Sequence, residues 1–164
     1  MRVARSQLIT IFIILSGGHL ISFAQLNAPE MKILTESADI IIIGKVTEQT
    51  SSWNENKSRI YTSATIQAEE FLKGNNNGNS VSVKYPGGEV DDIGEVYSHM
   101  PRFENNEDVL LFLKRDEKST EYKVLNGEDG KISIASDPNT GERILASNVK
   151  VSTLRAQIKS YLNN

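Results

Sequence analysis

Residues 38–46 read Ala-Asp-Ile-Ile-Ile-Ile-Gly-Lys-Val, and this stretch decides the fold class. Four consecutive isoleucines are typical of a strand, because β-branched side chains favour an extended backbone. In the expected strand, residues 40–49, apolar side chains occupy both faces at the start and only one face from Lys45 onward. We therefore expect a first strand that is buried on both faces where it begins and on one face where it ends.

Further apolar stretches continue this strand pattern. Residues 60–72 alternate between apolar and polar side chains, and a polar turn at residues 54–57 joins them to the first strand as a long hairpin. Residues 109–113, Val-Leu-Leu-Phe-Leu, form a continuous apolar run, which predicts a central strand. Shorter strands are expected at residues 81–85, 122–124, 132–134 and 144–146.

A helix is expected near each end of this strand-rich region. Residues 27–37 begin with Asn27 as an N-cap, carry Pro29 in the first turn, and place Met31, Ile33 and Leu34 on one face. Ser152 is expected to cap a final helix with an apolar stripe of Leu154, Ile158 and Leu162. Many short strands with turn signals predict a mainly β barrel or sandwich with a short N-terminal and a C-terminal helix.

Residues 1–24 predict secretion. Two arginines precede a mostly apolar stretch, and the small residues Ser22 and Ala24 occupy the −3 and −1 positions of a cleavage site. This is the layout of a cleavable signal peptide, and its apolar run is shorter than the ~20 residues that a membrane span needs. We therefore expect cleavage after Ala24, a secreted or periplasmic protein, and a single domain over residues 25–164.

The mature chain is expected to be acidic and to lack cysteine. Loss of Arg2 and Arg5 leaves 16 basic and 21 acidic residues, a net charge of −5 over 140 residues. An acidic surface argues against a nucleic-acid partner, and the lack of cysteine excludes disulfides, thiolate zinc sites and thiol nucleophiles. No second stretch is apolar and long enough to span a membrane. We expect no cofactor and no metal, and a fold held by its hydrophobic core.

Three segments, in this order, resemble a known module. They are residues 38–46, residues 68–74 (AEEFLKG), and Pro-Arg-Phe at 101–103 leading into residues 109–113. This order resembles the netrin-like, or tissue-inhibitor-of-metalloproteinase-like, module, in which the segments mark successive strands of an OB-type barrel. Within that group the chain is most similar to exported bacterial proteins without an assigned activity, which also carry a Pro-Gly-Gly stretch such as that at 86–88. The resemblance covers about residues 38–134 and implies an OB-like antiparallel β-barrel.

The chain departs from this family at two points. The animal inhibitors place a disulfide-tied N-terminal cysteine on the protease zinc, and this chain has no cysteine, so that mechanism does not carry over. Where the family has glycine before the acidic residue of a turn, this chain has Asn106 before Glu107. Asparagine adopts the left-handed conformation more readily than most residues, so we expect the turn to be kept.

No catalytic constellation stands out. His99 is the only histidine after the signal segment, and no serine lies in a Gly-x-Ser-x-Gly elbow, so we interpret His99 as an exposed loop residue rather than a catalytic one. The four acids within residues 89–95 could bind calcium but match no EF-hand spacing, which favours a solvated loop. Residues 137–141 begin like a calcium loop without its closing acid, which favours a hairpin turn.

Residues 86–103 are the strongest candidate for recognition. The segment is long and rich in glycine, and we expect it to be irregular, as functional loops often are. The alternative is a crossover in which Pro101 and Phe103 plug one end of the barrel. Trp53, like several tyrosines, is either an interface anchor or a packing residue. The candidate contact residues are Trp53, Tyr97, His99, Met100, Arg102 and Phe103.

These observations favour an exported, non-enzymatic module that binds an extracytoplasmic protein or ligand. The first alternative is a protease inhibitor or modulator without the cysteine mechanism, which would need an exposed wedge within residues 86–103. The second is a small envelope hydrolase, which would need a nucleophile beside His99. The third is a structural domain without a specific ligand.

Overall fold

The computed structural model describes residues 28–163, so the predicted signal peptide and its cleavage site after Ala24 lie outside the described residues. The helices and strands follow one another along the chain in this order: α1 (Ala28–Ser37), β1 (Ile40–Trp53), β2 (Ile60–Lys73), β3 (Ser80–Pro86), β4 (Gly88–Val90), β5 (Ile93–Glu95), β6 (Asp108–Arg115), β7 (Tyr122–Val124), the 3₁₀ helix η1 (Gly127–Gly130), β8 (Lys131–Ser136), β9 (Arg143–Leu145) and α2 (Val151–Leu162).

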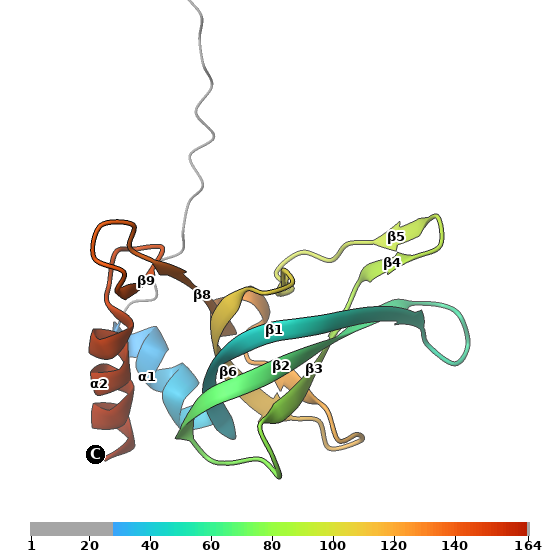
Figure 1. Ribbon diagram of the computed structural model, residues 1–164. Coiled ribbons are helices and arrows are strands. Elements are labelled where there is room, and N and C mark those ends of the chain that lie inside the picture. Colours follow the sequence, from blue (N-terminus) through green and yellow to red (C-terminus); the bar gives the residue numbers. More distant parts are fainter. Residues whose placement is uncertain (1–27, 164) are drawn as a thin grey trace, which may run out of the picture.

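Five strands close into a barrel (Figure 1). Their order is β1-β2-β3-β7-β6, and β6 returns to pair with β1. The pairs are antiparallel except for β3 and β7, which pair in parallel at Val83 and Tyr122. Strands β8 and β9 extend the sheet beyond β6. This five-stranded closed arrangement confirms the predicted OB-like barrel with a helix near each end.

The start of β1 is buried on both faces, as the four isoleucines predicted. Ile41 and Ile43 belong to a core cluster that includes side chains of both helices. Ile40, Ile42 and Val46 belong to a second cluster, formed with residues of β2, β3, β6 and β7. The apolar run at 109–113 is also buried throughout and contributes to both clusters. The barrel therefore has two layers of core, divided by β1 and β6.

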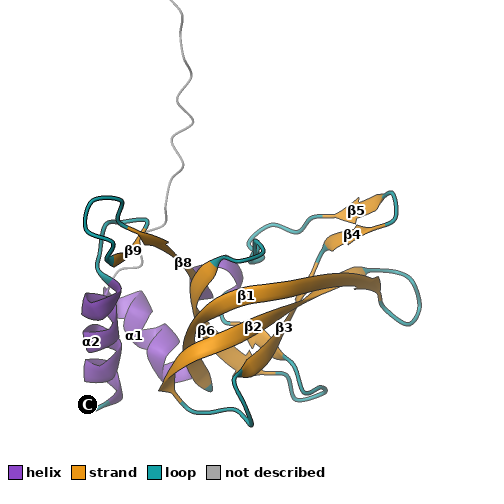
Figure 2. Ribbon diagram, in the orientation of Figure 1, coloured by secondary structure: helices purple, strands orange, loops and turns teal. Residues whose placement is uncertain are grey.

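Helices α1 and α2 lie side by side at one end of the barrel (Figure 2). Leu34, Leu154 and Ile158 are buried there, as predicted. Three helix details were wrong. Ile33 is 58% exposed, because only Met31, Leu34 and the hydroxyl-bearing Thr35 of α1 face inward. The last helix begins at Val151 with Lys150 at the N-cap, so the expected cap residue Ser152 lies inside the first turn, and Leu162 stays partly exposed.

One glycine within β1 and one turn before β6 shape how the strands approach one another. A Cβ at Gly44 would collide with the carbonyl oxygen of Gln67 on β2, so the close approach of β1 and β2 requires glycine there. Asn106 has φ 67°, and its N–H donates to the carbonyl of Val46 over 2.9 Å. This left-handed asparagine confirms the turn that was predicted before β6 at Asn106 and Glu107.

Residues 86–103 are more ordered than expected. They contain the β4–β5 hairpin, in which Glu89 pairs with Gly94 and Asp91 takes a left-handed φ of 54° in the turn. We call this hairpin the arm; it extends away from the helices and lies beside the part of the β1–β2 hairpin that is remote from them (Figure 1). Residues 137–141 form the predicted hairpin turn between β8 and β9, with the N–H of Asp137 donating to the carbonyl of Glu142 over 2.8 Å.

Candidate functional site

A cleft of about 670 Å³ opens on the barrel beside the end of β1, and we call it the aromatic cleft. The end of β1, the β1–β2 turn, the ends of β2 and β3, the segment before Pro101 and the β6–β7 loop all contribute to it. Its main lining side chains are Trp53, Tyr61, Lys84, Tyr85, Met100 and Lys118. The volume lies within the range of about 300–1,000 Å³ that is usual for ligand sites.

Three aromatic residues of the cleft are held differently. Trp53 and Tyr61 are half-buried and lie where β1 ends and β2 begins. The Tyr85 ring packs on the Phe103 ring at 5.5 Å between centroids, and its hydroxyl donates to the Gln49 side chain over 3.1 Å. Burial raises the pKa of Tyr85, so its hydroxyl stays protonated and can act as a donor. The core therefore fixes Tyr85, while Trp53 and Tyr61 present their rings to the cleft.

Charged groups around the cleft are mostly paired. Lys84 lies 3.3 Å from the Glu121 carboxylate and 5.6 Å from the centre of the Tyr61 ring. Burial raises the pKa of Glu121, but hydrogen bonds from Ser63 and Lys84 outweigh it and hold that pKa below its usual value. Glu121 therefore stays charged and keeps Lys84 in place.

The β6–β7 loop supplies the remaining charges. Lys123 lies 2.9 Å from the Asp116 carboxylate. Its hydrogen bond, together with the backbone N–H of Lys118, lowers the pKa of Asp116. The side chain of Lys118 has no ion-pair partner within residues 28–163, so its ammonium group is available to a ligand in the cleft.

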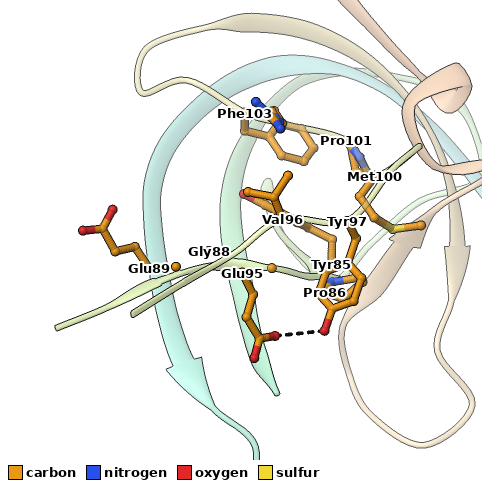
Figure 3. A pocket seen from close by; sticks show the side chains of 13 residues that line it. Tyr85, Pro86, Gly88, Glu89, Glu95, Val96, Tyr97, Met100, Pro101 and Phe103 are labelled. Carbon is orange, nitrogen blue, oxygen red and sulfur yellow. Dashed lines mark hydrogen bonds between the residues drawn. The ribbon is translucent and has the colours of Figure 1, made fainter. Parts of the chain in front are cut away.

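A second, smaller pocket of about 350 Å³ lies between the arm and the barrel, and we call it the arm pocket (Figure 3). Four residues line both pockets and so separate them: Tyr85, Pro86, Met100 and Pro101. The Tyr97 hydroxyl donates to the Glu95 carboxylate over 2.9 Å, and the backbone N–H of Ile60 donates to the same oxygen over 3.0 Å. The bond to Glu95 raises the pKa of Tyr97. Glu95 thus fastens the arm to the start of β2.

His99 makes a backbone contact and lines neither pocket. It has φ 60°, and its carbonyl accepts a hydrogen bond from the N–H of Glu128 over 3.0 Å. Its side chain is 83% exposed, and within residues 28–163 its ring makes one polar contact, to the Glu128 carboxylate at 3.2 Å. The interpretation of His99 as an exposed loop histidine is confirmed. Its turn directs the next residue, Met100, toward both pockets.

The structure brings together most of the predicted contact residues. Tyr97, Met100, Arg102 and Phe103 line the arm pocket, and Trp53 and Met100 line the aromatic cleft. His99 lines neither pocket. Pro101 and Phe103 are buried, so this part of the segment does plug the barrel, whereas the arm tip is exposed. The plug interpretation therefore holds for Pro101 and Phe103, and recognition by the exposed part of residues 86–103 stays a prediction.

Sequence reasoning missed Lys84 and the β6–β7 loop, which line the cleft opposite Trp53. The alternation of β3 was the available signal for Lys84, because buried Val83 leaves its neighbours on the outer face. For the β6–β7 loop, the signal would have been the OB-type strand order itself, since loops of that position flank the binding face of such barrels.

Neither metal chemistry nor relatives add to this description. Within residues 28–163, no three histidine, aspartate or glutamate side chains come close enough to hold a metal ion. In the same part of the chain, every helix is too short or too polar to cross a membrane. No protein-family model and no curated protein matches this sequence. The two pockets are therefore the features of the described residues that point to a function.

Proposed function

We propose that this protein is an exported, netrin-like, non-enzymatic module that binds another extracytoplasmic protein through the aromatic cleft. One observation carries the proposal: Trp53, Tyr61 and Met100 meet at one open cleft, and neither Trp53 nor Tyr61 belongs to either buried cluster of residues 28–163. Tryptophan, tyrosine and methionine are enriched in protein interfaces, where aromatic anchors carry much of the binding energy.

The export half of the proposal rests on the signal-peptide pattern of residues 1–24. The mature protein recovered from outside the cytoplasm should begin at Gln25, which N-terminal sequencing or intact mass measures directly. A product that retains Met1, or one that stays embedded in the membrane, would contradict export by this route.

The binding half can be tested by capture. Immobilised mature protein should retain a partner from the extracytoplasmic fraction of its source, and Trp53→Ala should lower the retained amount about tenfold. Ile33→Ala is a matched control, because it also truncates an exposed apolar side chain but lies on α1, at the helical end. Equal capture by the Trp53 variant, the control and the wild type would reject the cleft as the binding surface.

Protease modulation is a second candidate, and one observation favours it. It would need an exposed wedge, and the arm projects beyond the barrel with Ile93 and Val96 exposed at 53% and 74%. Mature protein should then inhibit at least one secreted protease, and shortening the arm should abolish that inhibition. The hydrolase alternative gains no support from the geometry, because His99 lies outside both pockets.

A further inference from the structure

We propose that the outer edge of β5 receives an extended, basic segment of a partner protein as an added β-strand. This inference deepens the proposed function and rests on it, because both require a protein partner. It differs in the surface used: the aromatic cleft supplies side-chain anchors, whereas the arm supplies main-chain hydrogen bonds.

The register of the arm shows which backbone groups are free. Val90 and Ile93 flank the two-residue turn and form a hydrogen-bonded pair. Because hydrogen-bonded and non-hydrogen-bonded pairs alternate along antiparallel strands, Glu89 and Gly94 form the other kind. The N–H and C=O of Gly94 therefore point away from β4, and no partner for them lies within residues 28–163.

The opposite side of the arm is already occupied. A Cβ at Gly88 would collide with the side-chain oxygens of Thr62 and Ser51, so β4 lies directly on the β1–β2 hairpin. Thr62 also donates to the carbonyl of Gly87 over 2.7 Å, and Glu95 accepts from the N–H of Ile60. β5 is thus the outer strand, and the barrel holds it in an extended conformation before any partner arrives. A preformed edge lowers the entropy lost on binding.

Side chains around this edge indicate the chemistry of the added strand. Ile93 and Val96 are exposed apolar residues, and Gly94 between them leaves open space for an approaching backbone. Glu89, Asp91 and Asp92 are exposed and form no ion pair within the described residues. An apolar edge beside three unpaired carboxylates complements a segment that alternates β-branched and basic residues.

The edge lacks most of the usual protection against pairing, although β5 is itself short. Natural sheets block exposed edges with lysine, proline or a bulge, and Ile93-Gly94-Glu95-Val96 contains none of these. The one charged side chain, Glu95, is turned toward Ile60 and Tyr97. A three-residue strand offers few main-chain bonds. Binding therefore also requires the flanking apolar and charge contacts, which makes it selective for basic segments.

The probe is a synthetic octapeptide of alternating valine and lysine, titrated into the full mature chain by fluorescence anisotropy. Two control peptides accompany it: the same sequence with every amide N-methylated, and one with glutamate in place of lysine. The variant pair is Gly94→Pro, which removes the outward N–H, and Gly94→Ala, which keeps it in a position with open space. Hydrogen exchange of the Gly94 amide is measured with and without the probe.

We expect the valine–lysine peptide to bind and to slow exchange at Gly94 about tenfold, while both control peptides bind at least about tenfold more weakly. Gly94→Pro should weaken binding by a similar factor, and Gly94→Ala should not. Equal binding of the N-methylated peptide overturns the proposal, and so does absence of binding by the unmodified one; neither needs a variant that folds. If Trp53→Ala weakens binding of the valine–lysine peptide and Gly94→Pro does not, the arm inference fails and the cleft proposal stands. If partner capture is kept in Trp53→Ala but lost in Gly94→Pro, the cleft proposal fails and the arm inference stands.

Discussion

The two halves of β1 have different surroundings. Near the helices, β1 side chains from Ile40 to Val46 are buried almost without interruption. Beyond Thr47 the same strand is only partly buried, and its last residue, Trp53, lines the aromatic cleft. We call these the barrel half and the far half. The comparison teaches that β1 separates packing from recognition along its length, because its own apolar side chains are buried only at one end, while Ile60 and Ala64 of β2 stay buried beside the far half.

The largest expected effect is on stability in the barrel half. Leu111 of β6 is fully buried and lies opposite Ile42 of the barrel half on the neighbouring strand, so Leu111→Ala should lower the free energy of unfolding by ~2–5 kcal/mol. Ser52→Ala changes an exposed residue of the far half and should lie within about 0.5 kcal/mol of the wild type. Urea denaturation measures both. Similar losses for the two variants would remove the distinction between the halves.

A pair of glycines sharpens the same comparison. Gly44→Ala places a Cβ against the Gln67 carbonyl and 2.9 Å from the Ala68 Cα, where only backbone could move, so we expect a loss of about 1–3 kcal/mol. Gly94→Ala in the arm meets nothing closer than 4.0 Å and should leave the unfolding midpoint unchanged. Thermal or urea unfolding of the two single variants measures both changes in stability. An unaffected Gly44 variant would show that the strands can separate there.

The arm pocket should affect binding more than folding. The double change Tyr97→Ala and Arg102→Ala should weaken partner binding by more than ~1.4 kcal/mol, a factor of ten, because both side chains line the pocket. Its cost in stability should stay well below that of Leu111→Ala, since Arg102 is exposed and Tyr97 bonds only the arm. If the double variant unfolds, the arm pocket is part of the core. If binding is unchanged, the partner contacts another surface.

The smallest expected effect is on the free energy of unfolding at acidic pH. Hydrogen bonds from Lys114 and from the backbone N–H of Arg115 lower the pKa of Asp39, which joins the end of α1 to β6. A depressed folded-state pKa contributes stability above the unfolded value, near 3.8, and that stability is lost as the pH falls through the folded value. Asp39→Asn should therefore flatten the dependence of unfolding free energy on pH below about 4. Asp92→Asn in the arm is the control, and an identical change in both variants would count against the Asp39 contacts.

The barrel could be predicted from the sequence because its strands are long, β-branched and buried. The runs at 40–46 and 109–113 carry their own strand signal, and the two are paired in the structure. The arm could not be predicted in the same way. Its strands have three residues each. Their position depends on the contact of Gly88 with Ser51 and Thr62, which are distant from it in the sequence.

Single residues of the site could be predicted, but not which of them meet. Trp53 and Met100 are suited to interfaces by residue type, and both line the cleft. The residue type of Lys84 and Lys118 did not mark them as site residues, because most lysines lie on the surface whether or not they belong to a site. His99 was included for its chemistry, yet its left-handed turn points the side chain into solvent. The backbone conformation at His99, and not its residue type, therefore determines that its side chain lies outside both pockets.

Site-specific photo-crosslinking tests the central claim, separate recognition at the far half, most directly. A photoreactive residue is placed at Lys118, which lines the aromatic cleft, or at Lys159, an exposed residue of α2 at the helical end. Both positions are exposed lysines, so folding should be equally preserved. The account predicts a partner adduct from position 118 and none from position 159. An adduct from position 159 alone, or equal adducts from both, would contradict it.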